Sequence, residues 1–429
     1  MQIAFDSLET RSVTLGFIPL LDCAPLIVAR DKGFFRQQGL DVLLSRESSW
    51  ASLRDRVALG VLDGGQMLHA LPIASLSGRD GLNVPMITAC VLNLGGNAIT
   101  VSSTLWERMR AADAVAADSA LAAAQALGRV ITEDRARRAA PLTFAITFPF
   151  SAHNYELRLW LSAGGVDPDR DLRLVVVPPQ QMLSHLTAGR IDGYCVGAPW
   201  NALAAVQGVG RVVAAKSDIW ENQPEKVLGV TRTWAERHPN THRALVRALL
   251  AACAWLDEPA HHGETAALLA QPGIVNAPVA LLAMLLGGKL VVEAEAPLRA
   301  LPDFIVFHRY AANFPWRSQI LLTLGEMRRA GQFGPGLDLR GLAAEIVAAD
   351  TYRAAAAELG LPAPTIDDKS EGTHAVGWTL RQATRPIAMG PDRLLGGRVF
   401  DPVMIGTDQA AKEEEGFGRG AAPSTKEKP

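Results

Sequence analysis

The sequence lacks the charge and ring content expected of a protein that binds polyanions or sugars. Its 429 residues include 42 lysines and arginines against 44 aspartates and glutamates, a formal net charge of −2. No excess of positive charge is present, which argues against nucleic acid or an acidic membrane surface as a partner. Aromatic residues make up only 6% of the chain, which argues against a carbohydrate site walled by rings.

Cysteines are few and scattered. The four of them, Cys23, Cys90, Cys195 and Cys253, form no C-x-x-C pair, and this spacing argues against a zinc site. We interpret them as buried, reduced thiols. The sequence also lacks a Walker loop, a nucleophile elbow and an H-E-x-x-H motif. We therefore expect no metal, no cofactor and no enzymatic activity.

Long uninterrupted apolar runs are missing, most tellingly near the N-terminus. Asp6 and Glu9 precede the first basic residue, Arg11, whereas a secretory signal begins with positive charge. The next apolar stretch, VTLGFIPLLDCAPLIVA, is interrupted by Asp22 and two prolines, and it is too short and too broken to span a bilayer. These features predict a cytoplasmic protein without membrane contact.

What the sequence does contain is a repeated alternation of strand and helix patterns. Strands are expected over 12–20, 40–47, 141–149 and 172–179, and helices over 22–39, 48–60, 151–165 and 180–189. This order predicts an α/β fold with two lobes, each a mostly parallel sheet covered by helices. In such sheets ligands bind at the carboxyl ends of the strands. Two facing edges therefore predict a ligand cleft between the lobes.

The composition also suggests domain boundaries. We expect lobe 1 to comprise residues 12–100 and 226–402, the latter with a helical C-terminal extension, and lobe 2 to comprise 101–225. An Ala- and Arg-rich helical insertion covers about 107–140 in lobe 2. Residues 406–429 are polar and rich in Gly and Pro, a composition that predicts a disordered tail.

Several segments together carry a resemblance to a known family. They include GFIPLLDCAPLIVARDKGFFRQQGLDV, ESSWASLRDRVALGVLDGGQML, VLNLGGNAIT, FPFSAHNYELRLWLSAGG and PEKVLGVT, in this order. The chain resembles, over about residues 12–402, the nitrate- and bicarbonate-binding proteins of bacterial ABC importers. The resemblance implies a type II periplasmic-binding-protein fold, with two lobes, two hinge crossings and a ligand between them.

The absence of an expected export signal selects among the branches of that family. Importer members carry such a signal or a lipoprotein anchor, so the sequence favours the cytoplasmic NasS-type nitrate/nitrite sensors. The resemblance then implies a partner, an RNA-binding antiterminator of NasT type, which is released when the anion closes the lobes. Two alternatives stay open: the substrate-binding component of a nitrate ABC transporter, and an enzyme that makes a thiamine pyrimidine, for which no histidine and cysteine cluster is found.

Three residues are the main candidates for the anion site. The resemblance implies that Lys226, in PEKVLGVT, pairs with the anion; otherwise it is a surface lysine beside Glu225. His153 lies in the first turn of a predicted helix, where free N–H groups favour anions. Trp50 begins another helix, and its indole N–H is a donor. The alternatives are a half-exposed histidine without a role and a tryptophan that fills the core.

Three further candidates lie near the predicted sheet edges. Gly96 and the glycine before it allow backbone N–H groups to approach a ligand, Asn97 adds two amide donors, and Gln66 is a weaker candidate. Nitrate has acceptors only, so we expect no carboxylate close to it. Bicarbonate carries an O–H donor, and the resemblance links it to a branch without lysine at position 226. The sequence therefore favours nitrate or nitrite and does not separate the two.

Overall fold

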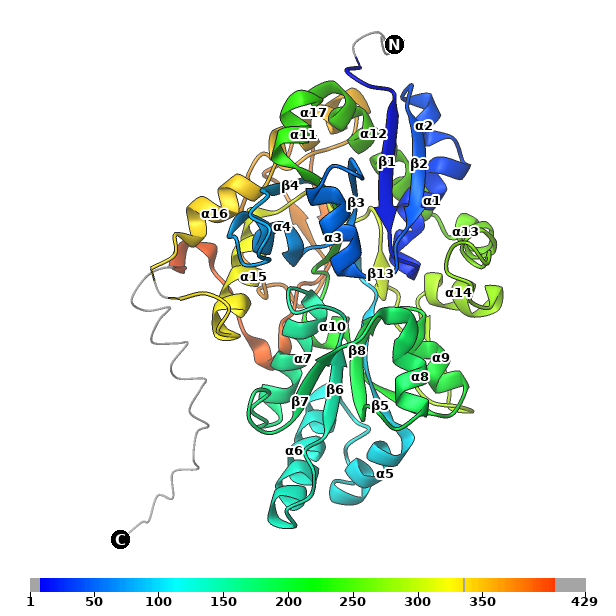
Figure 1. Ribbon diagram of the computed structural model, residues 1–429, viewed down its shortest axis with the longest axis vertical. Helices are drawn as coiled ribbons and strands as arrows, with labels where there is room; N and C mark the ends of the chain where they lie inside the picture. The colour runs from blue at the N-terminus through cyan, green and yellow to red at the C-terminus, as the bar shows by residue number, and fades with distance from the viewer. Residues whose placement is uncertain (1–7, 335, 406–429) are drawn as a thin grey trace.

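Two large sheets, one above the other in Figure 1, form the centres of two lobes in the computed structural model, which describes residues 8–334 and 336–405. In spatial order the first sheet contains β13 (Ile305–Val306), β4 (Met86–Gly95), β10 (Pro224–Thr231), β3 (Gly64–Leu68), β1 (Ser12–Phe17) and β2 (Asp41–Arg46). The second contains β7 (Arg173–Val176), β6 (Thr143–Ile146), β8 (Gly193–Gly197), β5 (Asn97–Ser102) and β9 (Gly210–Ala215).

The first lobe departs from the predicted parallel sheet where the chain returns from the second lobe. Strand β1 is parallel to β2 and β3, as its alternation with helices requires. Strand β10 is antiparallel to both β3 and β4, because it enters the sheet from the opposite side. The lobe's helices include α1 (Ala24–Asp31), α2 (Phe34–Gln37), α3 (Trp50–Ala58), α4 (Ala70–Leu76), α11 (Arg232–Arg237) and α12 (Pro239–Leu256). The single helix predicted over 22–39 is divided, because Gly33 adopts a left-handed φ of 79° between α1 and α2.

The second lobe has the same plan with a different antiparallel strand. Strand β6 is parallel to β7 and β8, whereas β5 is antiparallel to β8 and β9. Its helices are α5 (Ser103–Ala112), α6 (Ala120–Ala136), α7 (Ala152–Ala163), α8 (Met182–Thr187) and α9 (Trp200–Val206). The predicted helical insertion is thus two helices, α5 and α6. Helix α6 buries Ala123, Leu127 and Val130 in the core of this lobe.

The chain crosses between the lobes twice, at 95–97 and through α10 (Lys216–Ile219) into β10. The sequence places these boundaries at 100–101 and 225–226. At the first crossing Gly95 and Gly96 have φ values of 72° and 93°. Their N–H groups donate to the carbonyls of Gln223 (3.2 Å) and Phe304 (2.6 Å). The expectation that these N–H groups meet a ligand is therefore not met, because both already hold the crossing in place.

The C-terminal third contacts both lobes. It contains α13 (His262–Leu269), α14 (Val279–Leu286), α15 (Arg317–Arg329), α16 (Leu339–Ile346), α17 (Ala349–Glu358), and the strand pairs β11 (Lys289–Leu290) with β12 (Arg299–Ala300) and β14 (Trp378–Leu380) with β15 (Ile387–Met389). Its later part runs along one side of both lobes in Figure 1. Gln332 accepts from the Tyr155 hydroxyl (2.8 Å) of the second lobe, and Arg393 pairs with Glu221 (2.8 Å). Assigning all of 226–402 to lobe 1 was therefore too simple.

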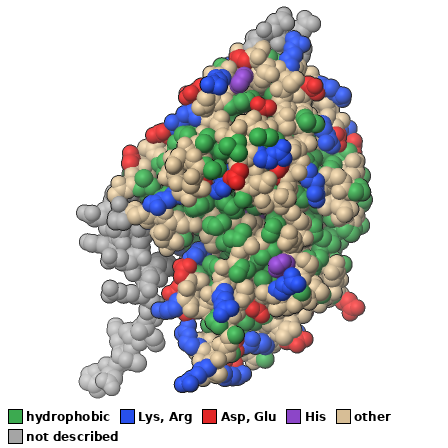
Figure 2. Space-filling view, in the orientation of Figure 1, with side chains coloured by type: hydrophobic (Ala, Val, Ile, Leu, Met, Phe, Trp, Pro, Cys, Tyr) green, Lys and Arg blue, Asp and Glu red, His purple; other side chains and the backbone are tan. Residues whose placement is uncertain are grey.

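Two general expectations concern the surface. Lysines, arginines and acidic residues are interspersed over the face shown in Figure 2, in keeping with the small net charge. No helix in the described part of the chain is both long and apolar enough to cross a membrane. The predicted tail, 406–429, lies outside the described residues.

Candidate functional site

A buried row of alternating charges joins the two lobes. Lys226 Nζ lies 2.8 Å from Asp22 Oδ2 and 2.9 Å from Glu225 Oε1. Lys216 Nζ lies 2.7 Å from Glu225 Oε2 and 2.9 Å from Glu156 Oε1. All five side chains are at most 2% exposed. We call this row the charge chain, with Glu225 as its centre; buried charges persist in a protein only when they are paired in this way.

The charge chain is assembled from elements of both lobes. Asp22 lies in the 3₁₀ turn Leu21–Cys23 after β1, Glu225 and Lys226 lie on β10, Lys216 begins α10, and Glu156 lies on α7. Neighbouring strand residues normally point to opposite faces of a sheet. The pairing of β10 with β4 is irregular on both sides of Lys226, and such an irregularity re-aims side chains. Glu225 and Lys226 can therefore both contribute to the space between the lobes.

The two lysines of the charge chain differ in one respect. An ammonium group has three protons to donate. Lys216 Nζ also donates to the carbonyl of Pro224 (2.9 Å), so all three of its protons have acceptors. Lys226 Nζ has two acceptors within the described residues and lies 5.3 Å from the centre of the Trp50 ring. Lys226 therefore retains one donor for a ligand.

Beside the lysines, Trp50 and His153 each have a buried ring nitrogen that lacks a hydrogen-bond partner in the described structure. Trp50 is the first residue of α3, after the capping Ser49, and its Nε1 has no partner. His153 lies in the first turn of α7, after the capping Ser151, and its Nε2 has none. A buried polar group without a partner costs roughly 1–3 kcal/mol. A ligand that accepts from both nitrogens would remove this cost.

The other ring nitrogen of His153 is already engaged. Its Nδ1 lies 3.2 Å from Thr147 Oγ1 and 3.5 Å from Glu225 Oε1. Burial lowers the pKa of His153 to about 3, although Glu225 opposes the shift. The ring is therefore neutral near pH 7 when the site is empty. If the Thr147 hydroxyl donates to Nδ1, the proton of the neutral ring is on Nε2.

The pKa values of the charge chain follow from its alternation. Burial alone would raise the pKa of Glu225, but Lys216 and Lys226 hold it well below its ordinary range. Burial raises the pKa values of Asp22 and Glu156, and the neighbouring lysine of each opposes the shift. The central carboxylate is therefore firmly ionised, and the two at the ends take up a proton more readily.

The remaining predicted donors serve the carboxylates. Asn97 Nδ2 donates to Glu225 Oε2 (2.6 Å) and to Glu156. Gln66 Nε2 donates to Asp22 Oδ1, and its Oε1 accepts from the backbone of Ile18. Both amides thus orient the charge chain. Asn97 has an acceptor for each of its two amide protons, whereas Gln66 Nε2 has one acceptor among the described residues and keeps a second proton. Asn97 Oδ1, an acceptor, is buried without a partner among the described residues.

The expectation of no carboxylate near the site was wrong. Asp22, Glu156 and Glu225 all lie there, because each is paired with at least one of the two lysines. Lys216 was also missed. Asp22, which interrupts an apolar run in the sequence, pairs with Lys226. Glu156 had a sequence signal: it falls on the same helix stripe as His153, Leu157 and Trp160, all buried.

Two acceptors of the site face Gly197. A Cβ placed on Gly197 would lie 3.4 Å from Asp22 Oδ2 and 3.5 Å from Asn97 Oδ1, which are ordinary contact distances. The absence of a side chain at Gly197 therefore leaves both acceptors uncovered on this side. Trp50, His153 and Lys226 supply the donors. The arrangement suits a small planar oxyanion.

Metal and thiol chemistry have little support in this region. In residues 8–334 and 336–405, no group of three or more His, Cys, Asp or Glu side chains is arranged to hold a metal ion. Cys195, on β8, is buried, and burial raises the pKa of its thiol well above the ordinary value. A thiol in that state is a poor nucleophile.

Comparison with known proteins gives the family. The sequence profile of the NMT1-like family matches residues 6–270, more than half of the chain. The chain belongs to the NMT1-like family. The predicted resemblance to nitrate- and bicarbonate-binding proteins is also confirmed. Bicarbonate-binding protein CmpA of Synechococcus elongatus is 33% identical over 84% of this chain and 81% of its own length. Nitrate/nitrite binding protein NrtA of the same species is 31% identical over 83% and 80%.

A further relative of this NMT1-like protein is longer than the chain. Nitrate import ATP-binding protein NrtC of Synechocystis is 40% identical over 76% of this chain, which covers 47% of that protein. The chain thus spans about half the length of the transport ATP-binding proteins that it matches.

Solved structures confirm the predicted type II binding-protein fold. The crystal structure of the periplasmic nitrate-binding protein NrtA from Synechocystis superposes with a TM-score of 0.81 at 25% identity, covering 96% of this chain and 99% of that one. The alkanesulfonate-binding protein SsuA from Xanthomonas axonopodis superposes with a TM-score of 0.55 at 14% identity, over 80% and 99%. The latter supports the fold alone.

Proposed function

We propose that this protein binds a small planar oxyanion, nitrate or nitrite in the first place, as the substrate-binding component of an ABC importer. One observation carries the proposal: Trp50 Nε1 and His153 Nε2, from opposite lobes, are buried without partners among the described residues. Lys226 links the two side chains, because its Nζ lies 5.3 Å from the Trp50 ring and it shares Glu225 with His153. An anion between the lobes satisfies all three groups. The names of the relatives, which include nitrate- and bicarbonate-binding proteins, support the same ligand class.

Three donors supply a large part of the affinity and not all of it. A hydrogen bond to a charged group contributes roughly 1.5–3 kcal/mol, so three contribute about 5–9 kcal/mol before the cost of association. Micromolar binding corresponds to about −8 kcal/mol. Every one of the three donors is therefore needed, and all are assembled only when both lobes contribute.

The charge chain makes proton uptake part of binding. Its three carboxylates exceed its two lysines by one negative charge, and a bound anion adds another. A buried excess charge of this kind costs several kcal/mol. A proton on His153 relieves it, because the charged ring donates from Nδ1 toward Glu225 and from Nε2 to the anion. Glu156, at the end of the row, is the alternative acceptor of the proton.

Titration calorimetry tests this proposal directly. Nitrate and nitrite are titrated in two buffers of different ionisation enthalpy, and the difference in heat gives the number of protons taken up. We expect binding with uptake of about one proton and an affinity that rises as the pH falls. Lys32→Met, which alters a part-exposed lysine paired with Glu264, is the matched control for Lys226→Met. Failure of both anions to bind the wild type would overturn the proposal.

Bicarbonate is a second candidate, favoured by the acceptors of the site. Asn97 Oδ1 is unpartnered in the described structure, and both it and Asp22 Oδ2 face Gly197, at 3.5 and 3.4 Å from the position that a Cβ on this glycine would take. The O–H of bicarbonate can donate to such acceptors, whereas nitrate cannot. Asp22→Asn keeps the volume and separates the candidates: bicarbonate affinity should fall more than nitrate affinity if bicarbonate is the substrate.

The sensor role stays a prediction. Of the relatives named above, nitrate import ATP-binding protein NrtC carries a transport name, and this name supports the importer role over a NasS-type sensor. If the protein is a cytoplasmic sensor, it should form a complex with a NasT-type antiterminator that dissociates when nitrate or nitrite is added. Persistence of that complex at saturating anion, or no complex at all, would exclude the sensor role. Cell fractionation tests the location.

A further inference from the structure

A second cavity lies on the second lobe, away from the charge chain. Its volume is about 550 Å³, within the range of pockets for organic ligands. Its walls come from six segments of the chain: Trp106 on α5, residues 116–121, β9, α10, and residues near 292–299 and 393–396. A cavity built from so many elements is a feature of the tertiary fold.

Unpartnered donors line this cavity. Trp106 is 3% exposed, and its Nε1 has no hydrogen-bond partner in the described structure. Arg211 stacks its guanidinium 4.3 Å from the centre of the Trp106 ring and pairs through Nη1 with Glu293. Its Nε and the hydroxyl of Ser217 are buried without partners. Three groups able to donate therefore await acceptors in one place.

The nearby carboxylates do not supply those acceptors. Three arginines and two aspartates line the cavity. Asp218 is held by both terminal nitrogens of Arg299, at 2.7 and 2.5 Å. Glu221 is held by Nε and Nη2 of Arg393. The 17-residue helix α6 also begins here, after the capping Ser119, and adds the positive end of its dipole.

The rest of the wall is apolar. Leu121, Val213, Leu394 and Leu395 line it, together with alanines of the 116–120 segment. An inorganic anion would fill little of this volume and would leave these side chains uncovered. The complementary ligand has acceptors at one end and an apolar body.

We propose that this cavity is a second binding site, for an organic carboxylate with a flat apolar body. The carboxylate accepts hydrogen bonds from Trp106, Arg211 and Ser217, and the body packs against the leucines and Val213. The site does not depend on the proposed anion site, although α10 separates the two: Lys216 joins the charge chain, and the next residue, Ser217, lines the cavity.

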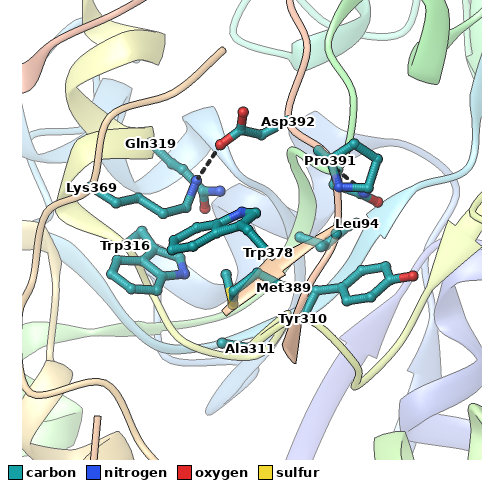
Figure 3. Close-up of a pocket in the computed structure, with 12 residues that line it drawn as sticks. Leu94, Tyr310, Ala311, Trp316, Gln319, Lys369, Trp378, Met389, Pro391 and Asp392 are labelled. Carbon is teal, nitrogen blue, oxygen red and sulfur yellow. Dashed lines mark hydrogen bonds and ion pairs between the residues drawn. The ribbon is translucent and has the colours of Figure 1, made fainter. Parts of the chain in front are cut away.

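A smaller cavity supplies a matched control. It lies against the C-terminal segments, and Trp316, Trp378, Lys369 and Asp392 are among its lining residues (Figure 3). Its volume of about 20 Å³ has room for about one water molecule. Trp378 Nε1 is also buried without a partner in the described structure. Trp378→Phe therefore removes the same chemical group from a cavity too small for an organic ligand.

Calorimetry with three probe carboxylates, naphthoate, benzoate and octanoate, tests the proposal. We expect saturable one-to-one binding, tightest for naphthoate, and weaker binding of the neutral naphthamide. Trp106→Phe keeps an aromatic side chain but removes the N–H with part of the indole, so it should weaken naphthoate binding about tenfold. Trp378→Phe should leave it unchanged. Saturating nitrate should not displace naphthoate.

Three results would overturn this proposal. One is that none of the three carboxylates binds the wild type at millimolar concentration. Another is that Trp106→Phe and Trp378→Phe weaken binding equally. The third is that nitrate displaces naphthoate, which would place the probe between the lobes. If Trp106→Phe does not fold, as judged by circular dichroism, Ser217→Ala takes its place with the same expected direction.

Discussion

The two buried lysines of the charge chain look equivalent and are not. Both are at most 1% exposed, both lie between two carboxylates, and they share Glu225. Lys216 has a third acceptor in the carbonyl of Pro224, whereas Lys226 has two acceptors in the described structure and the Trp50 ring nearby. Burial and charge therefore do not show which lysine binds the ligand. Lys226 is identified as the binding residue by the one ammonium proton that has no acceptor in the described structure.

The largest expected effect on stability comes from replacing Lys216, the lysine of the charge chain whose three protons all have acceptors. Lys216→Met leaves Glu156 and Glu225 with Lys226 as the remaining lysine of the row. An uncompensated buried charge costs about 3–5 kcal/mol, so we expect the free energy of unfolding to fall by about that amount. Urea titration measures it. Lys32→Met, at the part-exposed pair with Glu264, should change it by less than about 1 kcal/mol.

The next largest effect is on nitrate affinity, and it distinguishes Lys226 from Lys216. Lys226→Met removes the spare donor and should weaken nitrate binding by about 2–3 kcal/mol, some 30- to 150-fold. Lys216→Met, measured on protein shown to be folded, should weaken it much less, because no proton of Lys216 is left for the ligand. Equal losses in the two variants would show that the comparison is wrong and that net charge alone governs affinity.

Much of the fold was predictable because it depends on local patterns. The alternation of strands and helices in 12–68 and 141–197 predicted both lobes. The direction of β10 was not predictable in this way, since it depends on how the chain returns from the other lobe. The contacts of residues such as Gln332 with the second lobe are equally non-local.

The residues of the candidate site also separate into those that the sequence analysis named and those that depend on contacts between distant parts of the chain. Lys226, His153 and Trp50 came from a family resemblance, and the structure brings them together around Glu225. Glu225 itself was interpreted as a reason to place Lys226 at the surface. Whether a carboxylate repels an anion depends on the cation beside it, and that pairing exists only in the folded chain. Lys216 follows a buried strand directly, which is the one local signal it offered.

A smaller effect is the pH dependence of stability, to which buried histidines inside and outside the site contribute. Burial lowers the pKa values of His69 and His153 to about 3 and that of His242 to about 4. Below the ordinary value of 6.5 the unfolded chain takes up protons that the folded chain does not. Stability should therefore fall as the pH drops below 6.5, by roughly 1.4 kcal/mol per histidine per pH unit. Urea titrations across this range measure the slope.

Nitrate should change only part of that slope. If anion binding places a proton on His153, saturating nitrate removes its contribution and leaves that of His242, whose pKa shift comes from burial alone. His242→Gln should lower the slope equally with and without nitrate. A slope that nitrate leaves unchanged would contradict proton uptake at His153 and point to Glu156.

The smallest effect tests the unpartnered indole against a partnered one. Trp50 Nε1 has no acceptor within the described residues, whereas Trp160 Nε1 donates to the carbonyl of Ala120 (2.7 Å). Both Trp→Phe variants lose buried ring volume and therefore some stability. Trp160→Phe should cost about 1 kcal/mol more stability than Trp50→Phe, because it also loses a hydrogen bond, and should leave nitrate affinity unchanged. Trp50→Phe should weaken nitrate binding about five- to tenfold. If Trp50→Phe instead loses as much stability as Trp160→Phe and keeps full affinity, the indole belongs to the core and not to the ligand.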